Sequence, residues 1–342
     1  MEKAQMFSND HVAPKGAGEG LERLMTTIRA FMESRCLLTA LELDLFSSVG
    51  EGADSETIAS RIHCNARATG ILLNALVGMG MLEKKGEVYR NAPETARYFD
   101  RGSPESVRDG MLHNANIWHR WSTLTDVVRG GKPVHVRAEE NPNWTKNFIA
   151  AMNHYAGERA PVLVRTLGGS PEIRRILDLG GGSAIYSIAF AKAFPAVQCE
   201  ILDLPEVVPL TEQYIRAAGA SAQVKARAGS MITDDYGSGF DLIMLNAICH
   251  MFSEAQNREI FRRARQALAP KGRLSVQDFI LDPERTSPLH AALFAINMLV
   301  GTDGGNTYTE PDYTKWMLDA GFASVQRINL PGPADLIVGV AP

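Results

Sequence analysis

Two kinds of hydrophobic pattern divide this chain. Between residues 21 and 165 apolar residues recur mainly at helical spacing, whereas from Arg174 onward short apolar runs alternate with helical stretches. This alternation predicts a doubly wound α/β sheet. The expected strands lie near 174–179, 197–202, 223–228, 240–246 and 272–280. Two closely linked apolar runs at the end, 322–329 and 335–340, predict an antiparallel hairpin at a sheet edge.

The amino-terminal part predicts a helical domain. Residues 21–46 carry too much apolar surface for one exposed helix, so we expect them to be buried in their own domain or against a second subunit. Two short helical stretches, 54–62 and 65–82, precede a hairpin-like segment at 83–90, which is a winged-helix pattern. Residues 1–20 are polar and are expected to be mobile.

Residues 105–165 predict a helical linker rich in aromatic side chains. Such a cluster can form one wall of a small-molecule pocket, or it can simply be the packed core of the linker. The candidate pocket residues in this linker are His113, Trp118, Met152 and Tyr155. The whole chain then divides into a mobile end (1–20), a winged-helix domain (21–104), the linker (105–165) and a sheet domain (166–342).

A glycine turn follows the first predicted strand of the sheet. In Asp178-Leu-Gly-Gly-Gly182 the candidate ligand-binding residues are Gly180, Gly181 and Gly182, because their backbone bends tightly and a ligand can approach it closely. Asp203 ends the next apolar run, 21 residues after Gly182, where a carboxylate can accept hydrogen bonds from both ribose hydroxyls. The pair predicts a cofactor that contains adenosine. A glycine turn without any ligand is the alternative.

The spacing of the glycines favours one cofactor. A dinucleotide fingerprint requires a third glycine, and that position is Ile185. The turn also has no Lys or Arg to meet a phosphate. S-adenosylmethionine carries adenosine and an amino acid but no phosphate, and Asp178, interpreted as part of the turn, could hold its ammonium group. We therefore expect S-adenosylmethionine, with S-adenosylhomocysteine as product, rather than the nicotinamide cofactor of an oxidoreductase.

Charge and cysteine content exclude other classes. The chain of 342 residues has a formal net charge of -4, which gives no drive toward nucleic acid or an anionic membrane. In the winged-helix segment acidic residues at least balance basic ones, and the second helical stretch carries only Arg67, which disfavours a ligand-sensing DNA-binding regulator. Four cysteines without paired spacing, and no signal or transmembrane segment, indicate the cytoplasm and no structural zinc.

The combination of motifs resembles the dimeric S-adenosylmethionine-dependent O-methyltransferases of the plant caffeate and acetylserotonin type and their bacterial relatives. The matching segments are the glycine turn, Asp203-Leu-Pro205 and Ile248-Cys-His250. The resemblance implies a Rossmann-like class I methyltransferase sheet preceded by a mainly helical, winged-helix dimerisation domain. It also implies a homodimer that methylates a small molecule, most simply at a hydroxyl, without a metal.

The resemblance also assigns roles to residues. His250 is the expected general base and Asp278 the carboxylate that orients it, and both lie at carboxyl ends of neighbouring predicted strands. For the cofactor it adds Leu204, Ser230, Met231 and Asn246. The candidate acceptor-binding residues near the helix that follows Pro288 are Phe294, Asn297, Met298 and Asn306.

The chain departs from the family pattern at four positions. Thr307 stands where the family has a second catalytic glutamate, and Ser230 where an aspartate faces adenine. Asn246 replaces a frequent lysine, and Phe252 replaces a tryptophan. None of these changes removes cofactor binding. The missing glutamate keeps S-, N- or C-methylation on the same scaffold as an alternative, since a thiolate or enolate acceptor needs little help from a base.

Overall fold

The computed structural model describes residues 18–136, 141–168 and 173–342. The chain forms two compact units, Met1–Arg108 and Asp109–Pro342. The segment 1–20, which is predicted to be mobile, lies almost entirely outside the described residues. No helix in the described ranges has both the length and the apolar character that a membrane span requires.

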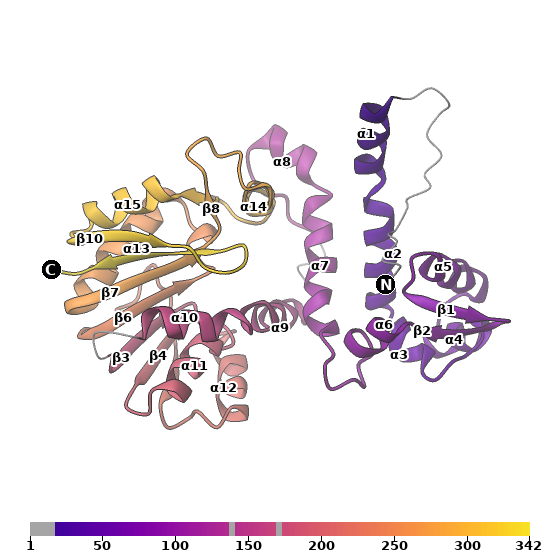
Figure 1. The fold of residues 1–342 in the computed structure, drawn as a ribbon, viewed down its shortest axis with the longest axis horizontal. Helices are drawn as coiled ribbons and strands as arrows, with labels where there is room; N and C mark the ends of the chain where they lie inside the picture. The colour runs from indigo at the N-terminus through magenta and orange to yellow at the C-terminus, as the bar shows by residue number, and fades with distance from the viewer. Residues whose placement is uncertain (1–17, 137–140, 169–172) are drawn as a thin grey trace, which may run out of the picture. The chain divides into compact units, whose positions relative to one another are not determined.

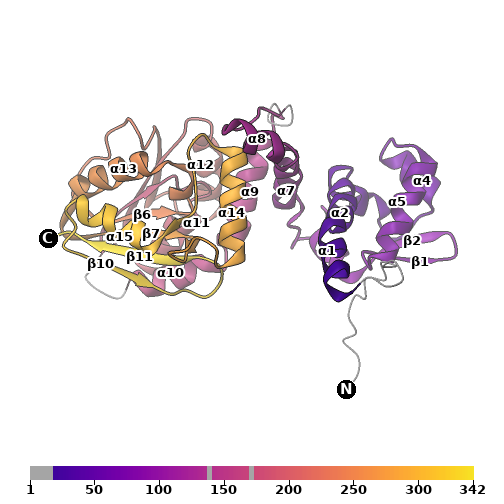
Figure 2. The same cartoon turned by 90° about the horizontal axis from the view of Figure 1, so that it is seen from above.

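The first unit has the predicted winged-helix arrangement. Its short helices α4 and α5 begin at Asp54 and Asn65, whose side chains accept hydrogen bonds from Thr57 N and Ala68 N and so satisfy free donors of the first turn. Figure 2 shows β1 and β2 as a hairpin beside these helices, and Gly86 makes the turn with a φ of 61°. The elements are α1 (Glu19–Arg29), α2 (Phe31–Glu42), α3 (Leu45–Val49), α4 (Ser55–Arg61), α5 (Ala66–Gly78), β1 (Leu82–Lys85), β2 (Val88–Asn91) and α6 (Pro93–Tyr98).

The helices α1 and α2 keep a row of apolar side chains exposed. Ile28 is 65% exposed, and four further large apolar residues on these helices are about half exposed: Leu21, Leu24, Phe31 and Met32. The rest of the unit has a closed core, in which Leu45, Ile58 and Leu73 are fully buried. Several large exposed apolar side chains on two consecutive helices are typical of an interface with another protein.

The second unit begins with helices and continues as a seven-stranded sheet. The helices are α7 (Arg108–Trp121), α8 (Leu124–Gly130), α9 (Trp144–Ala156) and α10 (Arg159–Leu167). The strands are β3 (Arg175–Leu179), β4 (Gln198–Asp203), β5 (Val224–Ala228), β6 (Phe240–Asn246), β7 (Leu268–Asp278), β10 (Ser324–Ile328) and β11 (Asp335–Val340). Their order is β10-β11-β7-β6-β3-β4-β5. Strands β3 to β7 are parallel, and β10 and β11 form the predicted antiparallel hairpin at the edge.

Helices cover both faces of this sheet, as Figure 1 shows. One core joins the sheet to α13 (Glu254–Ala267) and α15 (Glu310–Asp319), with Phe261, Tyr313 and Trp316 at its centre. The other joins it to α10, α11 (Ile185–Ala193) and α12 (Val208–Ala217). Burial on both faces explains why the central strands β3 and β6 read as nearly continuous apolar runs, whereas the edge strand β5 alternates.

The chain leaves the seven-stranded sheet after β7 and returns to it at β10. The two-residue strands β8 (Ile280–Leu281) and β9 (Tyr308–Thr309) pair in parallel, and α14 (Leu289–Gly301) lies between them in the sequence. Because the parallel strands point the same way, their carboxyl ends meet at one edge, where open α/β sheets bind ligands. That edge carries Asp203, Asn246 and Asp278 as the last residues of β4, β6 and β7.

Candidate active site

A buried histidine and aspartate lie together at the carboxyl edge of the sheet. His250 is in a short 3-10 turn, η2 (Cys249–Met251), directly after β6, and Asp278 ends the neighbouring β7. The Nδ1 atom of His250 is 2.7 Å from Oδ1 of Asp278, and the main-chain N–H of His250 donates to Oδ2 at 3.2 Å. The residues are 5% and 1% exposed. The carboxylate therefore fixes both the backbone and the ring of the histidine.

This contact determines which nitrogen of His250 can act as a base. A carboxylate only accepts hydrogen bonds, so Nδ1 carries the proton and Nε2 keeps a free lone pair. Among the described residues, the structure gives Nε2 no hydrogen-bond partner. The ring of Phe294, on α14, meets the imidazole edge to face with centroids 4.7 Å apart, and Phe279 lies against Phe294 at 4.5 Å. The imidazole thus lies in a largely apolar surrounding.

The glycine turn after β3 requires its glycines for two different reasons. Gly180 and Gly182 have φ values of 68° and 55°, in the left-handed region that side chains rarely adopt. Gly181 has no such φ, but a Cβ atom there would lie 2.9 Å from Ile201 Cγ2 and 3.0 Å from Asp178 Cγ. The turn can therefore be built only without side chains, and its main chain stays open to a ligand.

Asp203 is bonded to this turn. Its Oδ2 accepts from the main-chain N–H of Gly182 at 2.8 Å, and its Oδ1 accepts from that of Leu204, also at 2.8 Å. Burial raises the pKa of Asp203, and the two backbone donors act against that rise. Leu204 contacts this carboxylate through its main-chain N–H, and its side chain is 46% exposed.

Asp178 lies deeper than the sequence interpretation placed it. It is the fourth residue of β3, within the expected strand 174–179, rather than a residue of the turn that follows, and it is 1% exposed. Burial raises the pKa of Asp178 to about 7, against the hydroxyl of Ser187, which donates to Oδ2 at 2.7 Å. Asn246 lies beside the same carboxyl and favours its charged form, although neither polar atom of its amide completes a hydrogen bond.

The loop after β5 contributes Ser230 and Met231. The main-chain N–H of Ser230 donates to Oδ2 of Asp234 at 2.9 Å, so Asp234 holds the loop in place. Met231 is buried, and its Cε would lie 3.0 Å from a Cβ built on Gly180. Met231 is therefore next to the glycine turn. Asp234 escaped the sequence analysis because its role is to bond backbone rather than to complete a motif.

Two of the candidate acceptor residues contact His250, and a third is buried on the same helix as one of them. Phe294 touches the imidazole, Met298 is buried one turn further on, and the main-chain N–H of Asn306 donates to His250 O at 2.9 Å. Asn297 accepts a hydrogen bond from the indole N–H of Trp121 at 2.9 Å. This bond joins α14 to α7 through Trp121, an aromatic residue of the predicted linker.

The remaining linker candidates are not joined to His250 by any contact given for the described residues. His113 meets Phe148 edge to face at 5.2 Å, and burial lowers its pKa to about 4, so this histidine is neutral. Tyr155 is 39% exposed and contacts Asn114 at 3.5 Å. Trp118 and Met152 are half-buried.

The departures from the family pattern have structural counterparts. Thr307 is 1% exposed, and its hydroxyl has no hydrogen-bond partner. Its main-chain N–H donates to Asn306 Oδ1 at 2.8 Å. Phe252 accepts a hydrogen bond at its carbonyl from Tyr308. In the described part of the chain no three His, Cys, Asp or Glu side chains come together as a metal site would need.

This combination of fold and site defines a class of enzyme. A parallel sheet with a terminal antiparallel hairpin, a glycine turn after β3 and an acidic residue ending β4 is the arrangement of S-adenosylmethionine-dependent methyltransferases. The chain belongs to the O-methyltransferase family, whose O-methyltransferase domain matches residues 121–323 and whose dimerisation domain matches residues 25–100. S-adenosylmethionine is its cofactor, and small molecules are its substrates.

Individual relatives agree with this family. The chain is 30% identical to the tetracenomycin polyketide synthesis 8-O-methyl transferase TcmO of Streptomyces glaucescens, over 97% of this chain and 99% of that protein. It is 31% identical to the 3-hydroxy-5-methyl-1-naphthoate 3-O-methyltransferase of Streptomyces sahachiroi, over 90% and 92%. The solved structure of PigF with S-adenosylhomocysteine has a TM-score of 0.85 and 26% identity, covering 93% of this chain and 99% of that one. Other relatives are named as C- and N-methyltransferases.

Proposed function

We propose that this enzyme methylates a hydroxyl group of a small, partly apolar acceptor, with His250 as the general base. The observation that carries the proposal is the 2.7 Å contact between His250 Nδ1 and Asp278 Oδ1, buried at the carboxyl edge of the sheet. A carboxylate on one imidazole nitrogen makes the other a better acceptor of protons.

The residues at the edge fit the cofactor. S-adenosylmethionine supplies a methyl group on a positively charged sulfur. The Asp203 carboxylate suits the ribose hydroxyls, the glycine turn (180–182) leaves backbone accessible, and the loop of Ser230 and Met231 suits the adenine end. Asn246 offers an amide without partners beside Asp178, whose carboxyl can release its proton to water when a cationic group binds next to it. We assign these two residues to the ammonium end.

In the proposed reaction, residues of this chain remove one proton from the acceptor. The acceptor hydroxyl donates to Nε2 of His250, and Asp278 stabilises the imidazolium that results. Phe279 and Phe294 keep water away from this imidazole. A base of this kind contributes about 10²–10⁴-fold to the rate, and holding the two reactants in line accounts for much of the remainder.

The acceptor-binding wall that we propose consists of Phe294, Asn297, Met298 and Asn306, with Trp121 added. Two aromatic rings, a methionine and two amides suit a flat aromatic molecule that carries few polar groups. His113 is neutral, which suits an uncharged acceptor. The acceptors in the names of the two Streptomyces relatives, a naphthoate and a polyketide, support this chemical class.

Methylation at carbon, nitrogen or sulfur is the second candidate. Thr307 has an unpartnered hydroxyl where the family has a glutamate, so the pocket around His250 is less basic than in the family pattern. An enolate, amine or thiolate acceptor needs less proton removal than a phenol does. Relatives named for C- and N-methylation support the same view.

The assembly that we propose is a homodimer formed through the exposed apolar residues of α1 and α2, acting in the cytoplasm without nucleic acid or membrane partners. The matching dimerisation domain supports the dimer, and four free cysteines suit a reducing compartment. The division into 21–104, 105–165 and 166–342 stays our prediction for the domains.

The direct test is His250→Ala with a panel of hydroxynaphthoates, naphthylamines and thionaphthols as acceptors. We expect a loss of about 10²–10⁴-fold in turnover of a hydroxyl acceptor, with unchanged affinity for S-adenosylhomocysteine by calorimetry. His119→Ala, at an exposed histidine of α7, is the matched control. Wild-type turnover of hydroxyl acceptors in His250→Ala would contradict the proposal, and turnover of amines or thiols alone by the wild type would favour the second candidate.

A further inference from the structure

A buried tyrosine from a different part of the chain contacts the carboxylate that orients His250. The phenol of Tyr313, on α15, donates a hydrogen bond to Oδ2 of Asp278 at 3.2 Å. Tyr313 is fully buried and Asp278 nearly so. Apart from His250, Tyr313 is the one side chain among the described residues for which the structure gives a hydrogen bond to this carboxylate.

The hydrogen bonds of Asp278 are distributed over both of its oxygens. Oδ1 accepts from His250 Nδ1 at 2.7 Å and from the main-chain N–H of Phe279 at 2.9 Å. Oδ2 accepts from the main-chain N–H of His250 at 3.2 Å and from Tyr313. Without the phenol, Oδ2 would keep one long hydrogen bond, and the carboxylate would lose one of the four hydrogen bonds that resist rotation about its last torsion. Rotation there would move Oδ1 away from the imidazole.

The surroundings of Tyr313 fix both its position and its role as donor. Its ring stacks on Phe261 at 6.2 Å and meets Trp316 edge to face at 5.5 Å. Burial and the nearby Asp278 charge raise the pKa of Tyr313 well above its usual value, so the phenol keeps its proton. A protonated phenol in a packed aromatic cluster is a donor of fixed direction.

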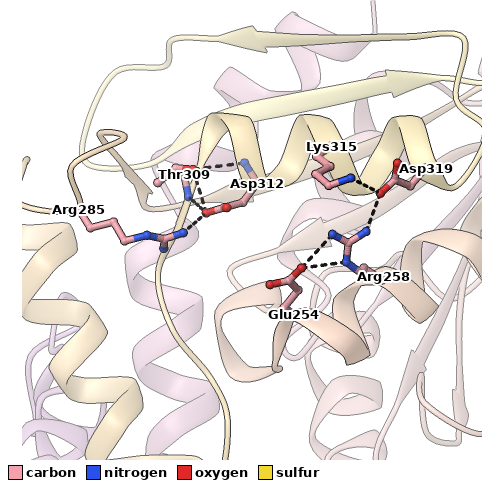
Figure 3. A network of polar contacts seen from close by, with 7 residues as sticks. All are labelled: Glu254, Arg258, Arg285, Thr309, Asp312, Lys315 and Asp319. Atoms are coloured by element: carbon pink, nitrogen blue, oxygen red, sulfur yellow. Dashed lines mark hydrogen bonds and ion pairs between the residues drawn. The ribbon is translucent and has the colours of Figure 1, made fainter.

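The helix that carries Tyr313 is anchored by polar contacts on its exposed side (Figure 3). Thr309 and Asp312 form a capping box at the start of α15, and Arg285 pairs with Asp312 at 2.7 Å. At the other end, Asp319 accepts from Lys315 and from Arg258 of α13. Each exposed pair contributes little alone, but together they hold both ends of a ten-residue helix, and Tyr313 lies between them on the buried side.

We propose that Tyr313 is a positioning residue of the methyl-transfer reaction: it holds Asp278 in the rotamer that orients His250. This role rests on the proposed function of His250 as the base. Tyr313 does not touch the acceptor, and it acts only through the carboxylate.

The variant that tests this role is Tyr313→Phe, which removes the hydroxyl and keeps the ring. Its matched control is Tyr308→Phe in the same aromatic cluster, where the lost phenol bonds the carbonyl of Phe252 instead of Asp278. We expect Tyr313→Phe to lower kcat for a hydroxynaphthoate about tenfold, the scale of one hydrogen bond to a charged group, with unchanged KM for S-adenosylmethionine. Tyr308→Phe should keep wild-type kcat.

A double-mutant cycle separates positioning from a general effect on folding. In the Asp278→Asn background Tyr313→Phe should cost nothing further, because the group through which it acts is gone. The same tenfold loss in that background, or an equal loss in Tyr308→Phe, would overturn the proposal. Wild-type kcat in Tyr313→Phe, together with an inactive His250→Ala, would also overturn the proposal about Tyr313. That result would leave the proposal of His250 as the base unaffected. If His250→Ala is fully active, the base proposal fails first, and the inference about Tyr313 fails with it.

A spectroscopic readout needs no acceptor at all. In protein with ¹⁵N-labelled histidine, the Nδ1–H proton of His250 should give a downfield resonance that is missing in His250→Ala. We expect Tyr313→Phe to shift this resonance or to lose it through faster exchange with water, and Tyr308→Phe to leave it in place. An unchanged resonance in Tyr313→Phe would overturn the inference.

Discussion

Gly182 and Asp203 are joined by a hydrogen bond of 2.8 Å from the main-chain N–H of the glycine to Oδ2 of the aspartate. The bond ties the turn after β3 to the end of β4, so the two parts of the expected cofactor site cannot move independently. In the cofactor site that we propose, Gly182 supplies open backbone and Asp203 supplies a carboxylate that this backbone holds in place.

Asp203→Asn should weaken cofactor binding without changing the chemical step. The amide keeps the shape but loses the charge and one acceptor, which leaves one of the two N–H groups of Gly182 and Leu204 without its partner. We expect the Kd for S-adenosylmethionine to rise about 10- to 100-fold, with kcat at saturating cofactor nearly unchanged. Glu206→Gln removes the same charge from an exposed position three residues later and should leave the Kd as it is. If the two changes raised the Kd equally, Asp203 would act only through its charge and not through direct contact with the cofactor.

Cofactor affinity should depend on pH through Asp178. Because burial raises the pKa of Asp178 to about 7, its carboxyl is largely protonated in the free enzyme near pH 6, and a cationic ammonium requires it to be ionised. Affinity should therefore fall as the pH drops from about 8 to about 6, and binding near neutral pH should release a proton. Calorimetry in buffers of different ionisation enthalpy measures that proton. Asp178→Asn should bind weakly at every pH and release none.

The same carboxyl affects the stability of the free enzyme. The folded protein binds this proton more tightly than the unfolded chain, whose Asp has a pKa near 3.8. Its contribution to the free energy of unfolding is complete below that value and is lost as the pH rises through about 7. We expect chemical unfolding of Asp178→Asn to lose this part of the pH dependence. An identical pH profile in the variant would show that another group is responsible.

Gly181→Ala should damage the turn by crowding. The added Cβ would lie 2.9 Å from Ile201 and 3.0 Å from Asp178, both of which are buried. Overpacking of this kind costs about 1–3 kcal/mol of unfolding free energy, and the displaced backbone should also weaken cofactor binding. Gly78→Ala, at the end of α5 with no atom within 4 Å of the new methyl, is the control. Equal stability of the two variants in urea titrations would rule out a tight turn.

Trp121→Phe should lower kcat/KM for the acceptor. The change removes the indole N–H that bonds Asn297 at 2.9 Å and leaves that amide oxygen without its partner. We expect a fall of about 5- to 100-fold in kcat/KM for the acceptor and no change in the affinity for S-adenosylhomocysteine, which serves as the internal control. If affinity for the product cofactor fell equally, Trp121 would belong to the fold rather than to the acceptor wall.

The exposed apolar row on α1 should determine the oligomeric state. Ile28→Glu places a charge at a side chain that is 65% exposed, and we expect it to convert the proposed dimer to a monomer in light scattering. Thr27→Glu puts the same charge on the neighbouring exposed position of the helix and should leave the dimer intact. If Ile28→Glu remained a dimer, the interface would have to lie elsewhere on the protein.

The sequence sufficed for features that are local in the chain. The strands β3 and β6 follow from buried apolar runs, and the glycine turn follows from consecutive glycines after the first of them. The winged-helix segment follows from two capped helices and a hairpin at Gly86. In each case neighbouring residues decide the outcome, so pattern and propensity suffice.

Contacts between distant segments could not be found in this way. Tyr313 and Asp278 are 35 residues apart, and Trp121 and Asn297 are 176 apart. Both contacts depend on how helices pack on the sheet or on each other, which no spacing encodes. The burial of Asp178 could not be found for a related reason: the expected strand 174–179 contains this residue, but its hydrogen bond to Ser187 depends on how α11 packs on the sheet.

The pairing of β8 with β9 makes the segment between them an exchangeable module. Ile280 and Leu281 lie beside Tyr308 and Thr309, so residues 282–307 leave this separate two-stranded sheet and return to it. That excursion contains α14 and its acceptor-facing candidates, whereas the glycine turn and Asp203 lie on other strands. In the sites that we propose, substitutions within this one contiguous stretch would change which acceptor is methylated and would leave the cofactor-binding residues as they are.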